Sequence, residues 1–128
     1  DVPFRFTTRF PMNTVKPLRL TLALMANEDA DTEKLMHALF KALWVDNRDI
    51  SSPEVLTEIL NETQIDAAYL EKITEPAIKE ELKTRTQEAI DRGVCGAPTY
   101  AVEEMLFWGQ DRVGFVEHAL KGWRPACG

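Results

Sequence analysis

Hydrophobic periodicity predicts that most of the chain is helical. Residues 14–26 and 32–45 carry apolar side chains three and four positions apart, which is the spacing of one helix face. Thr14 is the expected N-cap of the first segment. Its apolar face consists of Val15, Leu18, Leu22 and Met25. The second segment has a wider stripe, which predicts a helix packed on two sides: Leu35, Met36, Leu39, Phe40, Leu43 and Trp44.

Further helices are predicted before Gly93. Ser51 is the expected cap of a helix that runs to about residue 61, because Glu54 completes a capping box three positions later. Residues 66–73 are expected to form a short helix. The longest helix is predicted over 76–92 and ends at Gly93. Its inward face is expected to consist of Ile78, Leu82, Ala89 and Ile90.

In the last part of the chain, the period changes from that of a helix to that of a strand. Residues 99–102 and 105–108 are short β-type runs, and the two glutamates between them predict a tight hairpin. Asp111 is the expected N-cap of a last helix, whose apolar side carries Val113, Val116, Ala119 and Leu120. A lone hairpin is marginally stable in water. We therefore expect the chain to begin inside a larger protein that supplies further strands.

The distribution of charged and apolar residues excludes two classes of partner. The chain of 128 residues has a formal net charge of −6, and its basic residues are scattered. It therefore lacks the cluster of Lys and Arg that phosphate binding requires. None of its apolar runs reaches membrane-spanning length. Neither a nucleic acid nor a membrane is expected as a partner.

The two cysteines, Cys95 and Cys127, lie far apart in the sequence. They form neither a Cys-X-X-Cys motif nor a zinc-binding spacing, so no metal site is predicted. A secreted scaffold held by disulfides would contain more cysteine. Free thiols in a reducing compartment favour a cytoplasmic location.

Gly-Ala-Pro-Thr, at residues 96–99, joins the longest predicted helix to the hairpin. An X-Pro bond that leads into a strand is one place where a cis peptide is used. A cis bond between Ala97 and Pro98 would turn the N–H and C=O of Ala97 outward, where an extended peptide could pair with them. A plain connecting loop explains the same residues equally well.

Gly-Gln-Asp-Arg, at residues 109–112, opens the last predicted helix. The free N–H groups of a helix start favour a carboxylate, and the Asp111 side chain could hold an ammonium group. An amino-acid head group carries both charges. The alternative is that Asp111 is a plain N-cap. Taken together with the proline loop, the motif fits a γ-glutamyl tripeptide.

Four stretches of the chain resemble the 2-hydroxychromene-2-carboxylate isomerases and the kappa-class glutathione transferases. They are RFPMNTVKPLRL, ALFKALWVDNRDISSPEVL, LEKITEPAIKEELKTRTQEAIDRGVCGAPTY and FWGQDRVGFVEHALKGW. The resemblance covers almost the whole chain. It implies an α/β fold that is thioredoxin-like, of the DsbA type, with a helical insertion domain.

The same resemblance implies a division of the chain into three parts. Residues 1–13 would end the N-terminal thioredoxin half, 14–75 would form the helical insertion, and 76–128 would form the C-terminal thioredoxin half. The N-terminal βαβ unit of the family has no counterpart in this sequence. We therefore expect the chain to be the C-terminal part of such an enzyme.

Members of this family bind glutathione, and the resemblance implies which residues hold it. The backbone of Ala97, before Pro98, would pair with the cysteinyl part, while Gln110 and Asp111 would hold the γ-glutamyl end. Asn13 matches a further position near the active site and is counted among the glutathione-binding residues.

The implied activity is a glutathione-dependent isomerisation in aromatic-compound catabolism, in which the glutathione thiolate adds reversibly to a small aromatic substrate. A kappa-class glutathione transferase, whose thiolate would attack an electrophile, is the first alternative. Many members of the family are dimers, which implies a homodimer for the full-length protein.

The catalytic serine of the family lies in a Ser-Pro motif near the N-terminus, and this chain has no such motif. Ser52 and Pro53 belong instead to a helix start in the insertion. No catalytic residue is therefore expected among these residues, and the chain alone is expected to be inactive.

Two residues depart from the family pattern. Cys95 stands where relatives often carry an aromatic residue, and it is expected to be small, buried and inert. Glu103 stands where a turn glycine is common, which would distort the hairpin if the position needs a positive φ. His37 and His118 are expected to be structural or surface residues. Three aromatic residues are expected in the core rather than in a ligand wall: Trp44, Phe107 and Trp108.

Two other classes of protein remain open. A DsbA-like dithiol oxidoreductase would share the insertion and the Gly-X-Pro turn, but its Cys-Pro-X-Cys signature does not occur in this sequence. The clamp at 109–112 favours the glutathione enzymes, because a dithiol enzyme needs no amino-acid clamp. A helical interaction domain without enzymatic activity is the third interpretation.

Overall fold

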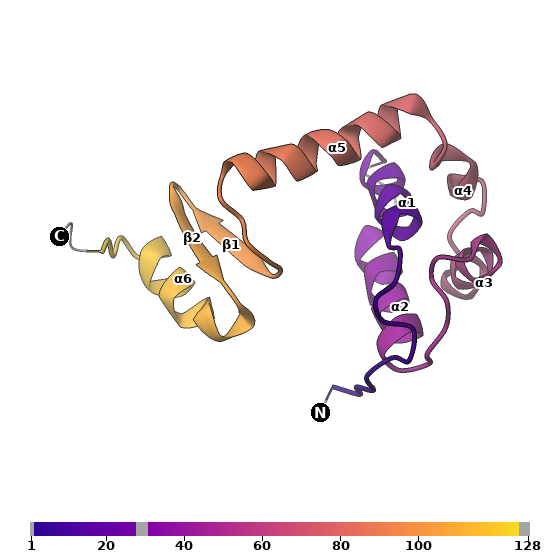
Figure 1. Ribbon diagram of the computed structural model, residues 1–128, viewed down its shortest axis with the longest axis horizontal. Helices are drawn as coiled ribbons and strands as arrows, with labels where there is room; N and C mark the ends of the chain where they lie inside the picture. Colours follow the sequence, from indigo (N-terminus) through magenta and orange to yellow (C-terminus); the bar gives the residue numbers. More distant parts are fainter. Residues whose placement is uncertain (1, 28–30, 126–128) are drawn as a thin grey trace. The chain divides into compact units, whose positions relative to one another are not determined.

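The computed structural model describes residues 2–27 and 31–125, where helices precede a β-hairpin (Figure 1). The elements are α1 (Val15–Met25), α2 (Thr32–Trp44), α3 (Pro53–Thr63), α4 (Tyr69–Lys72), α5 (Pro76–Asp91), β1 (Thr99–Val102), β2 (Met105–Trp108), the 3₁₀ helix η1 (Gln110–Arg112) and α6 (Val113–Leu120). The predicted order of helices, hairpin and last helix is confirmed. The chain forms two compact units, residues 1–84 and 85–128, so the boundary falls inside α5.

The core of the first unit lies between α1, α2 and α3. Each of these helices contributes fully buried side chains: Leu20, Leu24, Leu35, Leu56, Ile59 and Leu60. Burying one such side chain stabilises the folded state by roughly 1.5–3 kcal/mol relative to leaving it exposed. This cluster is therefore the main reason why the three helices pack together.

The main buried face of α1 is not the one that its spacing suggested. Leu20 and Leu24 are fully buried. Of the four predicted residues, Leu22 is buried, whereas Val15, Leu18 and Met25 are between 39% and 50% exposed. The helix carries apolar residues on most of its sides, so spacing alone could not select the inner one. Contacts with α2 and α4 select it.

Helix α2 is buried along one side in the described part of the chain. Leu35, Leu39 and Leu43 belong to the core, whereas Met36 and Phe40 are 44% and 59% exposed. The predicted packing on two sides is therefore wrong for the described residues. Met36 and Phe40 instead help to line an apolar cavity next to α1.

The cap of α3 lies one residue later than predicted. Ser52, not Ser51, is the N-cap: its hydroxyl accepts from Val55 N–H at 3.4 Å and donates to the Glu54 carboxylate. Ser51 donates its hydroxyl to Asp49 Oδ1 at 2.6 Å. Hydrogen bonds from the Ser51 side chain and backbone lower the pKa of Asp49. The proline after Ser52 sets this register, because proline fits the first helical position.

Helices α4 and α5 carry little of the core. Helix α4 is shorter than the predicted 66–73, because Asp66 Oδ1 accepts from Ala68 N–H at 2.9 Å and holds a turn there. Helix α5 matches its predicted bounds to within one residue, but none of its described side chains is buried, and Ile90 is 60% exposed. Of the predicted inward face, Ile78, Leu82 and Ala89 are half-buried and Ile90 is exposed, so the face is confirmed only in part. An apolar face is fully buried only where another element covers it completely.

The segment before α1 is attached to the end of α2 by aromatic side chains. The ring centroids of Phe4 and Phe6 lie 5.8 and 5.9 Å from that of Trp44. The Arg5 N–H donates to the Trp44 C=O at 2.6 Å. The segment thereby covers part of Trp44, which is half-buried.

Asn47 supplies the polar part of the same attachment. Its Oδ1 accepts from Thr7 Oγ1 at 2.7 Å and from Thr8 N–H at 3.1 Å, and its Nδ2 donates to Thr8 Oγ1 at 3.0 Å. Its C=O accepts from Arg9 Nε at 2.9 Å. Asn47 adopts a φ of +56°, which asparagine tolerates better than most residues. One residue therefore holds three consecutive residues of the N-terminal segment.

The hairpin forms the centre of the second unit. Strands β1 and β2 are antiparallel, with Thr99 opposite Trp108 and Val102 opposite Met105, so the turn contains the two predicted glutamates. Glu103 adopts a φ of +53°, the conformation for which glycine is the usual choice. The position therefore does need a positive φ, yet the register of the strands is regular.

Two arginines hold this turn. Arg92 Nη2 donates to the Glu103 C=O at 3.2 Å, and Arg124 Nη2 donates to Glu103 Oε1 at 2.7 Å. These contacts tie the end of α5 and the segment after α6 to the tip of the hairpin. They help to explain why a glutamate in the left-handed region does not distort the strands.

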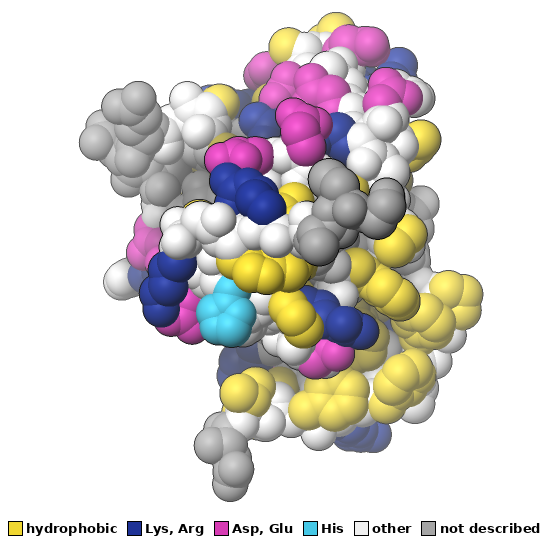
Figure 2. Space-filling view, turned by 90° about the vertical axis from the view of Figure 1, so that its left-hand side faces the viewer, with side chains coloured by type: hydrophobic (Ala, Val, Ile, Leu, Met, Phe, Trp, Pro, Cys, Tyr) yellow, Lys and Arg dark blue, Asp and Glu magenta, His cyan; other side chains and the backbone are white. Residues whose placement is uncertain are grey.

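Large apolar side chains remain at the surface of both units. Figure 2 shows several of them, in yellow, on one face, with acidic and basic side chains between them. The most exposed, each at least 59%, are Val2, Phe4, Phe6, Phe10, Phe40, Ile90, Trp108 and Leu120. Apolar surface of this extent is typical of chains that contact a further element or molecule. No described helix is both long and apolar enough to cross a membrane.

Asn47→Ala is expected to lower the free energy of unfolding by about 2 kcal/mol, because it removes several hydrogen bonds and leaves alanine with a left-handed φ. The loss is large because Thr7 is only 2% exposed, and its hydroxyl would lose its acceptor. Urea unfolding followed by circular dichroism measures the change. Asn47→Gly is the matched control, since it removes the same side chain and relieves the backbone, so it should destabilise less. Unchanged stability of the alanine variant would contradict this assignment.

Glu103→Gly is expected to raise the free energy of unfolding by about 1 kcal/mol before the lost ion pair is subtracted, because glycine adopts this φ without steric cost. The exposed pair with Arg124 contributes roughly 0.2–1 kcal/mol. Arg124 also donates to the C=O groups of Ala119 and Trp123, so the ion-pair contribution is measured as the difference between the effects of Arg124→Ala on the native protein and on the Glu103→Gly variant. If glycine at 103 destabilises the protein even in the Arg124→Ala background, the backbone explanation is wrong.

Candidate binding site

A cleft of about 300 Å³ opens in the second unit at the base of the hairpin. Its lining comes from the loop before β1, the end of β2 and the residues that follow: Ala97, Trp108, Gly109, Gln110, Asp111 and Arg112. Its size is at the lower end of the range for small-molecule sites. Three of the residues singled out from the sequence, Ala97, Gln110 and Asp111, therefore line one cleft.

Ala97 brings an open stretch of backbone to this cleft. The residue is exposed, and its peptide bond to Pro98 is cis. Among the described residues, no hydrogen bond involves the N–H or the C=O of Ala97. Both groups are therefore available to the backbone of an extended ligand.

One hydrogen bond joins the two sequence motifs. The Gly109 N–H donates to the Pro98 C=O at 2.9 Å, directly beyond the pair formed by Thr99 and Trp108. The residues after β2 are thereby brought next to the proline loop before β1. The two motifs meet because they occupy the two ends of one hairpin.

Asp111 lies in η1 and not at the start of α6, so its predicted role as N-cap is wrong. Arg112 occupies the N-cap of α6 and makes no capping hydrogen bond with its side chain. Gly109 explains the shift: it adopts a φ of +104°, and the Arg112 N–H donates to its C=O at 3.1 Å, which closes a 3₁₀ turn. The Asp111 side chain is 68% exposed, and its Oδ2 lies 3.4 Å from Arg112 Nε. Gln110, in the same turn, is also exposed.

Trp108 is not a core residue, in contrast to the sequence-based expectation. It is 59% exposed and forms part of the cleft wall. A Cβ at Gly96 would lie 2.6 Å from Trp108 Nε1, so the indole edge sits directly on the Gly96 backbone. The sequence carried one signal for this role, because Trp108 immediately precedes the Gly109 of the second motif. Phe107 and Trp44 are half-buried.

Cys95 is exposed and free, so the prediction of a buried thiol is wrong. It lies in the loop between α5 and β1, where its neighbours Val94 and Gly96 are half-buried. The small apolar character of cysteine gave no information about which way this loop would turn. Cys127 lies outside the described residues.

Asn13, the remaining predicted ligand-binding residue, belongs to the first unit. Thr14 occupies the N-cap position of α1, as predicted, but its side chain makes no capping hydrogen bond. The Asn13 Oδ1 instead accepts from the Val15 N–H at 3.0 Å. A role for Asn13 in binding stays a prediction.

The two histidines are surface residues, as expected. His37 is 79% exposed, with Nε2 at 3.6 Å from Glu33 Oε1, and His118 is exposed on α6. Within residues 2–27 and 31–125, no group of three His, Cys, Asp or Glu side chains is placed to hold a metal ion.

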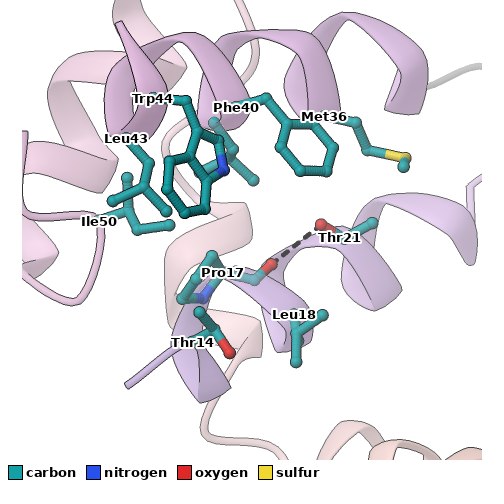
Figure 3. Close-up of a pocket in the computed structure, with 10 residues that line it drawn as sticks. Thr14, Pro17, Leu18, Thr21, Met36, Phe40, Leu43, Trp44 and Ile50 are labelled. Atoms are coloured by element: carbon teal, nitrogen blue, oxygen red, sulfur yellow. Dashed lines mark hydrogen bonds between the residues drawn. The ribbon is translucent and has the colours of Figure 1, made fainter. Parts of the chain in front are cut away.

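A second cavity, almost wholly apolar, lies in the first unit between α1 and α2 (Figure 3). It measures about 290 Å³ and is lined by Thr14, Pro17, Leu18, Thr21, Met36, Leu39, Phe40, Leu43, Trp44 and Ile50. In Figure 3 the rings of Phe40 and Trp44 face Pro17 and Leu18 across the cavity. The Thr21 hydroxyl is engaged within α1, where it donates to the Pro17 C=O at 2.9 Å. Such a lining suits a flat and apolar molecule.

A family model and curated relatives match this chain. Residues 1–121 match the model described as the DSBA-like thioredoxin domain. The 2-hydroxychromene-2-carboxylate isomerase of Sphingobium xenophagum is 31% identical over 121 residues, covering 94% of this chain and 60% of the relative. Glutathione S-transferase kappa 1 of Homo sapiens is 28% identical over 134 residues, covering 94% of this chain and 59% of the relative. The chain therefore spans about three-fifths of the length of these relatives.

Solved structures share the same fold. A 2-hydroxychromene-2-carboxylate isomerase superposes with a TM-score of 0.72 at 21% identity, over 94% of this chain and 58% of its own. The cytosolic disulfide reductase DsbM from Pseudomonas aeruginosa, solved with GSH, superposes with a TM-score of 0.68 at 19% identity, over 91% of this chain and 68% of its own. The predicted thioredoxin-like fold of the DsbA type is therefore confirmed.

Gly109→Ala is expected to lower the free energy of unfolding by about 1–3 kcal/mol, because its backbone conformation is close to one reserved for glycine. The added Cβ would also lie 2.5 Å from Asp111 Oδ1 and displace that carboxylate. Gly114→Ala is the matched control: it lies in α6 with nothing within 4 Å of its Cβ, so it should stabilise by about 0.5–1 kcal/mol. Urea unfolding of both variants tests the contrast. Equal effects of the two substitutions on the free energy of unfolding would show that the backbone conformation at position 109 does not require glycine.

Proposed function

Because the chain belongs to the DSBA-like thioredoxin domain family, we propose that its protein is a glutathione-dependent isomerase of the 2-hydroxychromene-2-carboxylate isomerase type. The observation that carries the proposal is the cleft of the second unit, which is lined by Ala97, Gln110 and Asp111 together. These residues supply the two kinds of group that a γ-glutamyl tripeptide needs, an open backbone and a carboxylate.

The residues of the cleft fit glutathione in their chemistry. The N–H and C=O of Ala97 have no described partner, so they can pair with the backbone of the cysteinyl residue. The exposed Asp111 carboxylate can accept from the γ-glutamyl ammonium group, and such charge-assisted hydrogen bonds are about twice as strong as neutral ones. The exposed Gln110 amide can donate to the carboxylate of the same head group.

When bound, glutathione would supply a thiolate, which is the nucleophilic form of a thiol and can add reversibly to a small aromatic substrate. The residues of this chain bind and orient. Ala97 would fix the cysteinyl backbone and so limit where the sulfur can lie, and Asp111 would anchor the far end. We assign no nucleophile or proton donor to this chain, in keeping with the proposal that the serine of the family lies elsewhere in the protein.

A kappa-class glutathione transferase is the second candidate, because the human kappa relative also matches 94% of this chain. Both candidates use the same glutathione site, and they differ in what the sulfur attacks. A disulfide reductase such as DsbM shares the fold. DsbM was itself solved with GSH, so a clamp formed by Gln110 and Asp111 does not separate it from the glutathione enzymes. The isomerase and the kappa transferase are favoured because they are the curated relatives of this chain.

The first unit by itself contains an apolar cavity whose chemistry suits a small aromatic molecule. Its lining includes the rings of Phe40 and Trp44 and the apolar surfaces of Pro17 and Leu18. A flat ring system would replace water on these surfaces at a gain of roughly 25 cal/mol per Å².

The proposal also includes a cytoplasmic location and a homodimeric full-length protein. The exposed apolar side chains of each unit are in keeping with a surface that contacts a partner.

Asp111→Asn is expected to raise the Kd for glutathione about tenfold, because the amide keeps the shape of the carboxylate and loses the charge that pairs with ammonium. Isothermal titration calorimetry with the full-length protein measures this change in Kd. Glu117→Gln is the matched control, since Glu117 is another exposed acidic residue of the second unit and pairs with Lys121 at 2.6 Å, outside the cleft. Its affinity should be unchanged. Absence of glutathione binding by the native protein would refute the proposed function.

A further inference from the structure

The cleft contains an aromatic wall that the predicted binding residues do not explain. Trp108 ends β2, pairs with Thr99 and is 59% exposed, so a large part of its indole faces solvent. It is the one aromatic side chain among the residues that line the cleft. The same side chain also lines a neighbouring depression with Leu106, Phe107, Arg112 and Phe115. An indole in a cleft offers a flat apolar face, which suits a peptide-like ligand.

Gly96 shows that this wall has a defined position. A Cβ at Gly96 would lie 2.6 Å from Trp108 Nε1, which is shorter than real contacts of a Cβ, and 3.2 Å from Cε2, which is a tight contact. The indole edge is therefore seated on the Gly96 backbone. The φ of Gly96 lies outside the left-handed region, so glycine is needed here for space and not for its backbone conformation. The Thr99 hydroxyl donates to the Gly96 C=O and helps to hold this part of the loop.

We propose that Trp108, seated on Gly96, is a specificity-determining residue that covers the γ-glutamyl–cysteinyl amide of bound glutathione. This inference rests on the proposed function. The Ala97 backbone and the Asp111 carboxylate hold the cysteinyl part and the head group, so the linkage between those parts lies between them, over the remaining surface of the cleft. Trp108 supplies the apolar part of that surface. A flat amide packs well against a flat indole, whereas a free amino acid has no linkage to place there.

The first test is the affinity of Trp108 variants for glutathione, measured by calorimetry on the full-length protein. Trp108→Ala is expected to raise the Kd about tenfold and Trp108→Phe about threefold, because phenylalanine keeps part of the flat surface. Trp123→Phe and Trp123→Ala are matched controls: Trp123 is 43% exposed, packs against Phe115 and does not line the cleft. Both should bind glutathione with the native affinity. Urea unfolding of every variant shows whether a change in affinity reflects a loss of folded protein.

The second test is a double-mutant cycle between Gly96 and Trp108. Gly96→Ala alone is expected to weaken glutathione binding several-fold, because the methyl group displaces the indole. In the Trp108→Ala background the same substitution should have no effect on the Kd, because the space beside residue 96 is then empty. This conditional effect would not arise if Gly96 only maintained the loop.

The outcomes separate this inference from the function on which it rests. If native protein fails to bind glutathione, the proposed function and the role of Trp108 are both refuted. If glutathione binds and Asp111→Asn weakens it, but Trp108→Ala stays within twofold of native, the role of Trp108 alone is refuted. An equal loss from Gly96→Ala in the presence and absence of Trp108 refutes it as well.

Discussion

The hydrogen bond from the Gly109 N–H to the Pro98 C=O, 2.9 Å long, determines how the second unit is arranged. A neutral backbone hydrogen bond contributes only about 0.5–1.5 kcal/mol to stability, so its importance here is geometric. It extends the hairpin by one step beyond its last residue pair and fixes where each flanking segment leaves the strands. The open backbone of Ala97 and the turn that carries Gln110 and Asp111 line one cleft because of it. Their proximity is a property of the hairpin and needs no contact between their side chains.

Much of this architecture could be predicted from local sequence rules. The helices and the two-residue turn followed from periodicity and from the residues expected in turns. These features depend on neighbours within a few positions, which is the range over which sequence patterns carry information. The residues of the two binding motifs were found for the same reason, since each motif is contiguous.

What could not be predicted depends on contacts between distant segments. The inner face of α1 was missed because that helix is apolar on most sides, and only the neighbouring helices distinguish Leu20 from Leu18. Trp108 was expected in the core because its size favours burial, yet its place is decided by the space above Gly96, twelve positions earlier in the chain. Cys95 was missed for a related reason: the direction of a loop residue is set by the elements at both of its ends.

The dependence of the N-terminal segment on Asn47 has a consequence for the chemical durability of the protein. Asparagine is among the thermolabile residues, because its amide can hydrolyse to a carboxylate. That change would keep the oxygen that accepts from Thr7 and Thr8, but it would replace the Nδ2 donor facing the Thr8 hydroxyl with a second acceptor. It would also place a negative charge beside Arg9 and in the neighbourhood of Asp49. Ageing of one amide would thus change the charge and the hydrogen bonding of a segment that no strand pairing secures in the described structure, without any break in the chain.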